Sequence, residues 1–275
     1  MSYKLKTILF WIFAVIFTIS IAFYQRMTGP TYPKKGNISI AGKVVKFKLL
    51  RSQENTQDAI ISIDNSEHLY GGSIVYKKYK KLEDWTEVQM IQNGDKLQGN
   101  LPIQPAAGKL EYRVFLKYGN ESFALNTEPV VIRFTGAVPK YILFPHILFM
   151  FLAMLFSTRT GIEAIIKGKH CLNYALVTVI TLFLGGVILG PIVQKYAFGA
   201  FWTGWPFGGD LTDNKTAIAF IFWVLAAYKL YKNREKRGFA IAAMVILLAV
   251  YMIPHSMFGS ELDTNTGKVT TGQQK

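Results

Sequence analysis

Two of the four histidines in this chain share one setting. His146 and His255 each follow a proline inside an apolar stretch, within residues 144–147 and 253–256. Neutral imidazoles on two helices can ligate a haem iron from opposite faces, and a histidine can also join carboxylates around a divalent metal. The pair therefore predicts one haem b, or another metal ion or a quinone site. The alternative is a pair of interfacial histidines that hydrogen-bond between helices and bind no cofactor.

Two aspartates that lie close together in the sequence are further candidate ligands for the metal ion. Asp210 and Asp213 stand just before an apolar stretch and could supply carboxylate ligands beside His146 and His255. Asp213 or Thr212 is also expected to cap the helix that follows, because Asp and Thr side chains accept hydrogen bonds from free N–H groups at helix starts.

The loop that carries these aspartates, residues 195–214, is rich in aromatic residues and glycine. Trp and Tyr favour the headgroup layer of a membrane, so this outer loop is predicted to lie in the interface or to dip back as a lid. Trp202 and Trp205 are the candidate lid or interaction residues. An aromatic belt that binds no ligand is the alternative.

Five apolar stretches must position these groups. They cover residues 7–24, 141–156, 172–193, 217–231 and 239–257. Each is near the roughly 20 residues that an α-helix needs to cross a bilayer. The sequence therefore predicts a five-span membrane protein, with an anchor at residues 1–25 and a four-helix region at residues 138–258.

Basic residues orient the predicted spans. Lys and Arg gather in three short segments, at Lys4 and Lys6, at Arg159, Lys167 and Lys169, and within residues 229–237. Such residues stay on the cytoplasmic side. We expect a bacterial cytoplasmic membrane protein with its N-terminus inside and with the aromatic loop and C-terminus outside. His146 and His255 then share one depth in the outer leaflet.

The formal net charge of +14 does not indicate a nucleic-acid partner, because many of the cations are cytoplasmic anchors that meet anionic lipid. The sharpest remaining basic cluster consists of Lys77, Lys78, Lys80 and Lys81. A solvated edge strand protected by lysine is one interpretation. A docking patch for an acidic partner or a polysaccharide is the other.

The insert at residues 26–137 is predicted to be an all-β sandwich on the outer side. Short β-branched and aromatic runs, separated by turn residues, predict seven strands, at residues 44–50, 59–63, 73–79, 86–91, 96–101, 110–117 and 130–134. Asn93-Gly94 marks a hairpin. The lone Cys171 falls in a cytoplasmic loop, so no disulfide is expected in the insert. The tail at residues 259–275 is predicted to be extracytoplasmic and disordered.

Residues 72–135 resemble the later strands of bacterial Ig-like and fibronectin type III-like domains. The resemblance rests on Trp85, Val88 and Met90, on Gly94-Asp95, and on the Pro/Gly-rich passage at residues 101–112. It implies that Trp85 is a core residue and that Tyr112 packs and hydrogen-bonds at a strand corner. It implies nothing specific about function, because such sandwiches serve many roles.

The remaining motifs weigh against catalysis and transport. The sequence contains no Gly-x-Ser-x-Gly elbow, no phosphate-binding glycine loop and no His-Glu-x-x-His. We therefore expect a non-catalytic accessory protein or complex subunit that contacts membrane lipid and binds another protein through its sandwich or its helical bundle. A redox or metal-binding membrane subunit that uses the histidine pair is the alternative.

Overall fold

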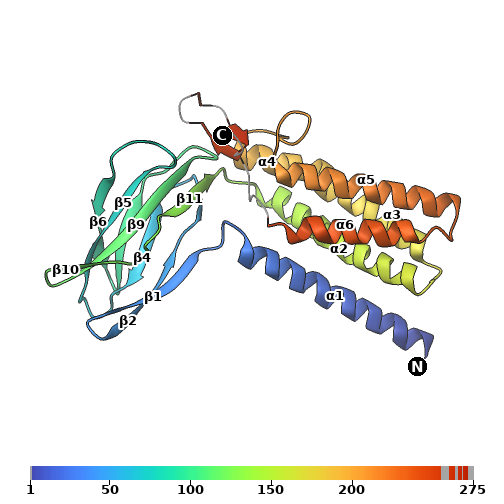
Figure 1. The fold of residues 1–275 in the computed structure, drawn as a ribbon, viewed down its shortest axis with the longest axis horizontal. Coiled ribbons are helices and arrows are strands. Elements are labelled where there is room, and N and C mark those ends of the chain that lie inside the picture. The colour runs from blue at the N-terminus through green and yellow to red at the C-terminus, as the bar shows by residue number, and fades with distance from the viewer. Residues whose placement is uncertain (1, 255–259, 264–265, 268, 272–275) are drawn as a thin grey trace. The chain divides into compact units, whose positions relative to one another are not determined.

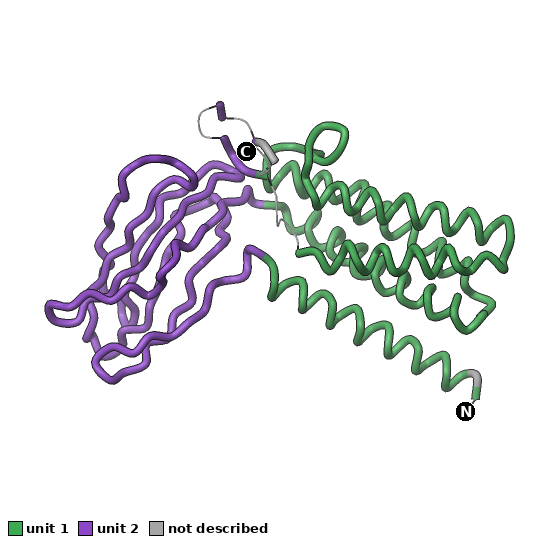
Figure 2. The backbone as a smooth tube through the Cα atoms, viewed as in Figure 1, with its two compact units in different colours: residues 1–29, 138–260, 270–275 green, residues 30–137, 261–269 purple. Residues whose placement is uncertain are grey.

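The computed structural model describes residues 2–254, 260–263, 266–267 and 269–271. The chain forms two compact units (Figure 1, Figure 2). One unit is helical and comprises Met1–Gly29, Val138–Ser260 and Thr270–Lys275, whereas the other is built of β-strands and comprises Pro30–Ala137 and Glu261–Val269. A β-domain is thus inserted after the first helix, as the sequence predicts.

The helical unit consists of five continuous helical segments among the described residues. They are α1 (Tyr3–Thr28), α2 (Lys140–Ile165), the run of α3 (Cys171–Leu182), the π-helix η1 (Phe183–Leu189) and α4 (Gly190–Phe198), then α5 (Leu211–Lys232) and α6 (Gly238–Met252). Three segments, Lys4–Thr28, Lys140–Ile165 and Cys171–Phe198, are long and apolar enough to cross a membrane, and Gly238–Met252 is a shorter apolar helix.

Small residues let these helices approach one another closely. Buried alanines surround the fully buried Trp223, on α2, α3, α5 and α6 (Ala153, Ala175, Ala219, Ala226, Ala240 and Ala243). A Cβ at Gly161 of α2 would lie 2.0 Å from Sδ of Met244 on α6. Interfaces rich in small residues are typical of helices packed within a bilayer.

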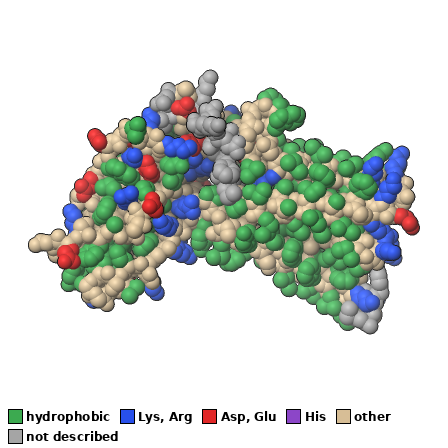
Figure 3. Space-filling view, in the orientation of Figure 1, with side chains coloured by type: hydrophobic (Ala, Val, Ile, Leu, Met, Phe, Trp, Pro, Cys, Tyr) green, Lys and Arg blue, Asp and Glu red, His purple; other side chains and the backbone are tan. Residues whose placement is uncertain are grey.

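The outer surface of the helical unit is apolar along its length and basic at one end. Large apolar side chains such as Ile8, Phe13 and Ile221 are exposed. Lys and Arg gather where the N-terminus and the α5–α6 turn lie (Figure 3). This separation of apolar flank and basic end is the pattern of helices that cross a membrane.

The strand bounds in the β-unit are β1 (Lys34–Ile40), β2 (Lys43–Leu49), β3 (Ser52–Glu54), β4 (Ala59–Asp64), β5 (Gly71–Lys78), β6 (Thr86–Gln89), β7 (Ile91–Asn93), β8 (Lys96–Leu101), β9 (Lys109–Tyr118), β10 (Glu121–Ala124) and β11 (Val130–Thr135). One sheet has the order β3-β11-β9-β5-β6, with β10 also on β9, and a second has the order β4-β8-β7. The β1–β2 hairpin forms a third, two-stranded sheet.

Most predicted strands are confirmed, and one is divided. The run predicted at residues 86–91 forms β6 and β7, which pair with β5 and β8 in different sheets. The hairpin predicted at Asn93-Gly94 is confirmed, because Asn93 pairs with Lys96 and Gly94 adopts a φ of 56°. Strand β1 was not predicted from the sequence.

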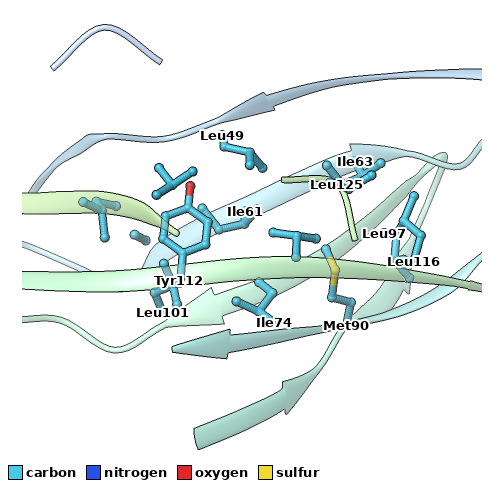
Figure 4. Close-up of a cluster of buried hydrophobic side chains, with 14 of the residues drawn as sticks. Leu49, Ile61, Ile63, Ile74, Met90, Leu97, Leu101, Tyr112, Leu116 and Leu125 are labelled. Carbon is cyan, nitrogen blue, oxygen red and sulfur yellow. The ribbon is translucent and has the colours of Figure 1, made fainter. Parts of the chain in front are cut away.

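The β-unit core confirms one expectation of the resemblance and overturns another. Tyr112 is fully buried among aliphatic side chains (Figure 4), and its hydroxyl donates to Leu50 O at 2.8 Å. Burial raises the pKa of Tyr112 above its ordinary value. Trp85, in contrast, is 39% exposed. The expectation of a core tryptophan is wrong, because Trp85 lies in the loop between β5 and β6, where its ring contacts Lys77 and Arg113 on the exposed face of the sheet.

The tail, predicted to be disordered, has two short strands among its described residues. Strands β12 (Ser260–Leu262) and β13 (Val269–Thr271) pair with each other. Leu262 N donates to Ala107 O at 3.1 Å, and Glu261 forms an ion pair with Lys109 at 2.8 Å. Burial lowers the pKa of Lys109 despite this bond. The tail is therefore held to the β-unit by backbone and charged contacts.

Candidate functional site

A polar cavity lies at the end of the helical unit where α4, the aromatic loop and the start of α5 meet. Its volume is about 120 Å³, and its lining includes His146, Gln194, Asp210, Asp213 and Thr216. Three residues predicted as site residues thus line one cavity. His255, the fourth, lies outside the described residues.

Helix geometry brings His146 into this cavity. The π-helix η1 passes so close to α2 that a Cβ at Gly185 would lie 2.9 Å from Cβ of Phe149. A Cβ at Gly186 would lie 2.7 Å from Cγ2 of Thr216 on α5. Only glycine allows both approaches. π-Helical turns of this kind occur frequently at functional sites.

The same turn orients the His146 ring. Nδ1 of His146 lies 2.9 Å from Gly185 O. A carbonyl oxygen only accepts, so Nδ1 carries the hydrogen, and in the neutral form of the ring the lone pair is on Nε2. An imidazole fixed in this way is the usual state of a histidine that ligates a metal or accepts a hydrogen bond from a ligand.

The two aspartates hold the loop in place. Oδ2 of Asp213 accepts from Thr203 N at 2.6 Å and from Gly204 N at 3.0 Å. Asp210 is the N-cap of α5 and accepts from Thr212 N at 2.7 Å. The prediction that Asp213 or Thr212 caps this helix is therefore wrong, because the N-cap lies less than one turn earlier, at Asp210. Both carboxylates bind backbone N–H groups, which reduces their capacity to bind a cation.

Two aromatic side chains of the loop are strongly exposed. Trp205 is 78% exposed and Phe207 is 83% exposed. The Trp202 indole donates to Trp205 O at 3.1 Å, and Trp205 N donates to Asn214 Oδ1 at 2.6 Å. Neither tryptophan lines the polar cavity. This geometry suits a loop that presents its rings to a headgroup layer better than a lid that closes over a ligand.

No metal site is complete among the described residues, where no three His, Cys, Asp or Glu side chains come together in a suitable group. The haem and metal hypotheses need His255, which the structure leaves undescribed. They remain predictions.

The lysine cluster is part of a structured sheet face. Lys77 and Lys78 end β5, and Lys80 and Lys81 follow in the next turn. Strand β5 lies between β9 and β6, so the interpretation as an edge strand is wrong. Lys77 pairs with Glu111 at 3.4 Å, and Lys80 pairs with Glu261 at 3.3 Å. Lys78 is exposed, and Lys81 is partly exposed.

Trp85 is the centre of the contacts on this face. Nζ of Lys77 lies 5.2 Å from the centroid of its ring, and Cζ of Arg113 lies 5.7 Å from it. Both distances fall within the range of cation–π attraction. The exposed side of the sheet thus presents an indole flanked by Arg113 and by Lys77, which is itself paired with Glu111.

Sequence reasoning missed a buried ion pair at the opposite end of α2. Arg159 was expected in a loop, but α2 continues to Ile165, and Arg159 Nη1 lies 2.7 Å from Glu163 Oε2 with both side chains almost fully buried. The guanidinium also lies 5.0 Å from the Tyr174 ring centroid and 5.6 Å from that of Trp11. The four-residue spacing of Arg and Glu after an apolar run was the available signal.

Searches against models of protein families, curated proteins and solved structures found no match.

Proposed function

We propose that this chain is a multi-pass protein of a bacterial cytoplasmic membrane whose Ig-like sandwich stands outside and binds an acidic protein partner. In this role the protein is a non-catalytic accessory or complex subunit. One observation carries the proposal: Trp85 stands on an exposed sheet face with Lys77 and Arg113 against its ring.

Strand alternation supports this face as a binding surface. Leu110, Tyr112, Val114 and Leu116 of β9 are buried, so the alternate residues, including Arg113, project to the opposite side. Tryptophan and arginine are the side chains most enriched among residues that dominate binding energy at protein interfaces. Cations around a rigid indole favour a partner with carboxylates.

The distribution of charge supports the membrane placement. Apolar helices of sufficient length carry Lys and Arg at one end of the helical unit (Figure 3). With that end in the cytoplasm, the insert between α1 and α2 lies outside, together with the aromatic loop.

Photo-crosslinking in the native host tests the proposal. A photoreactive residue replaces Glu87, which is exposed on β6 beside the Trp85 face, and in a matched variant replaces Asn100, which is exposed on β8 of the other sheet. We expect one protein to be captured from position 87 and not from position 100.

Charge reversal supplies the control. Lys77→Glu combined with Arg113→Glu should abolish the adduct at position 87, because both cations beside the indole become anions. The captured protein should also lose its affinity as ionic strength rises. Equal capture from both positions, or capture that survives charge reversal, would contradict the proposal.

A further inference from the structure

The hairpin of β1 and β2 is a second basic region of the β-unit. The first 53 residues of the chain contain no aspartate or glutamate, and the hairpin lies within them. It forms a two-stranded sheet of its own and shares no residue with the Trp85 face. Its five lysines are Lys34, Lys35, Lys43, Lys46 and Lys48.

Strand alternation gives the hairpin an inner and an outer face, because successive side chains of a strand point to opposite sides. Ile40 of β1 and Val45 and Leu49 of β2 are buried in the core of the β-unit. The alternate residues are all exposed, and we term them the hairpin face: Lys35, Asn37 and Ser39 of β1 with Val44, Lys46 and Lys48 of β2. Three lysines thus project from one outward surface.

The three lysines of the hairpin face repel one another. Lys35 pairs directly with Lys48 across the two strands, and like charges in opposite positions destabilise a hairpin. Within the described part of the chain, no carboxylate lies at ion-pair distance from Lys35, Lys46 or Lys48. Lys43, beside the turn, is in contrast paired with Glu67. An external anion would relieve the repulsion on this face.

The chain itself keeps the hairpin face close to the end of α1. Lys35 follows Thr28, the last residue of α1, by seven positions, so their Cα atoms lie at most about 25 Å apart. With 26 residues, α1 is about 39 Å long and extends beyond a hydrocarbon core of about 30 Å. Where α1 crosses a membrane, lipid phosphates are therefore within reach of Lys35 and of Lys48 opposite it.

The composition of the hairpin face favours a lipid surface over a protein partner. Lysine is depleted at protein–protein interfaces, whereas aromatic residues and arginine are enriched there, and the hairpin face has neither of these. Lysines close to a membrane, in contrast, are attracted to anionic headgroups. Each flexible lysine stem can follow a phosphate without a fixed geometry.

We infer that the hairpin face docks on anionic phospholipid headgroups of the membrane that α1 crosses, with Lys35, Lys46 and Lys48 as the residues that contact phosphate. Docking would restrict the rotation of the β-unit about its connections to the helices. The inference is independent of the partner proposed for the Trp85 face and depends on α1 as a membrane span.

Fluorescence quenching of the full chain in nanodiscs tests the inference. In a Cys171→Ala background, a fluorophore on Asn37→Cys reports contact of the hairpin face with spin-labelled headgroups. We expect strong quenching in discs of mixed phosphatidylcholine and phosphatidylglycerol, and little in phosphatidylcholine alone. High ionic strength should abolish it, because salt screens exposed charges.

Substitution of the three lysines gives the expected magnitude. A lysine near an anionic surface shifts the ratio of docked to free hairpin by roughly fivefold, so Lys35→Gln, Lys46→Gln and Lys48→Gln together should lower the ratio about a hundredfold. The matched control removes the same charge from exposed positions on β5, β8 and β9, with Lys78→Gln, Lys96→Gln and Lys117→Gln. The control should keep the quenching of the natural sequence.

Hydrogen exchange of the β1 and β2 amides separates lost docking from a lost fold. The hairpin variant should be protected at least as well as the natural sequence in phosphatidylcholine discs, because it has lost the repulsion between Lys35 and Lys48. Absence of quenching with phosphatidylglycerol, or equal quenching in both lipids, would overturn the inference. Equal loss of quenching in the hairpin variant and in the control would overturn it too.

Discussion

The side chain with the clearest energetic role in the β-unit is Tyr112. Its ring is fully buried, and its hydroxyl bonds to a carbonyl 62 residues earlier, at Leu50. Tyr112→Phe keeps the ring but leaves Leu50 O without this donor. We expect a loss of about 1–2 kcal/mol in the free energy of unfolding of the β-unit, measured by hydrogen exchange on the full chain. Tyr118→Phe, at a tyrosine that is 40% exposed, should change it little.

Tyr112 and Trp85 show what a resemblance to Ig-like strands predicts at single residues. Tyr112 lies in the middle of a strong alternating pattern, and the pattern itself predicts its burial. Trp85 lies in the loop directly before β6, where no alternation assigns a side, and the cations on β5 and β9 that contact it lie elsewhere in the sequence. Its position therefore follows from tertiary contacts.

His146 is the residue on which the haem and metal hypotheses and the hydrogen-bonding alternative differ most sharply. Because Asp210 and Asp213 bind the loop backbone, we expect the detergent-purified protein to be colourless and free of stoichiometric metal in oxidised and dithionite-reduced spectra. His146→Ala should leave those spectra unchanged. A Soret band, or a bound metal, lost in both His146→Ala and His255→Ala would instead establish a haem or metal site.

Among the secondary-structure elements, a strand without an apolar pattern depends for its conformation on the strand with which it pairs. The seven strands predicted from the sequence have clear apolar alternation or β-branched runs. Strand β1 has Lys, Gly and Asn among its residues and acquires its conformation by pairing along its whole length with β2. The end of α2 was missed for a different reason, because the buried ion pair of Arg159 with Glu163 lets the helix continue past its apolar run.

The candidate site was predictable only in part. That His146 and the two aspartates lie at the same end of the helices followed from the order of the apolar stretches. The π-helical turn at residues 183–189 did not, because it depends on how closely Gly185 approaches α2.

Strand β12 gives a pH-dependent prediction. Burial acts to raise the pKa of Glu261, but the hydrogen bonds and charges of Lys109 and Lys80 prevail and lower it below its ordinary value of 4.5. A carboxyl with a lowered pKa stabilises the folded state above its unfolded pKa and ceases to do so as the pH falls through its folded pKa. We expect the Leu262 amide, which bonds to Ala107 O, to lose protection from hydrogen exchange below about pH 4.5, after correction for intrinsic rates.

Glu261→Gln should reduce that protection already at neutral pH, because the amide carries no charge for Lys109 or Lys80. Glu121→Gln, at an exposed position on β10, is the control and should leave it unchanged. Protection of Leu262 that is independent of pH and of Glu261 would mean that the backbone bond alone holds the strand.

For the whole molecule, the distribution of charged residues is the sequence feature that predicts how the chain is oriented in a membrane. The 31 Lys and Arg residues outnumber 17 Asp and Glu, yet few basic residues occur in the loop after α4. The excess gathers at one end of the helical unit and on the Trp85 face. A membrane that retains basic segments in the cytoplasm would fix the orientation of every helix from this asymmetry.

Cysteine accessibility in intact cells tests that orientation, because Cys171 is buried and is the only cysteine of the chain. In a Cys171→Ala background, a membrane-impermeant maleimide should label Asn100→Cys on the sandwich without permeabilisation. It should label Asn233→Cys, in the basic α5–α6 turn, only after the membrane is opened. The reverse pattern would place the sandwich in the cytoplasm and remove the basis for an envelope partner.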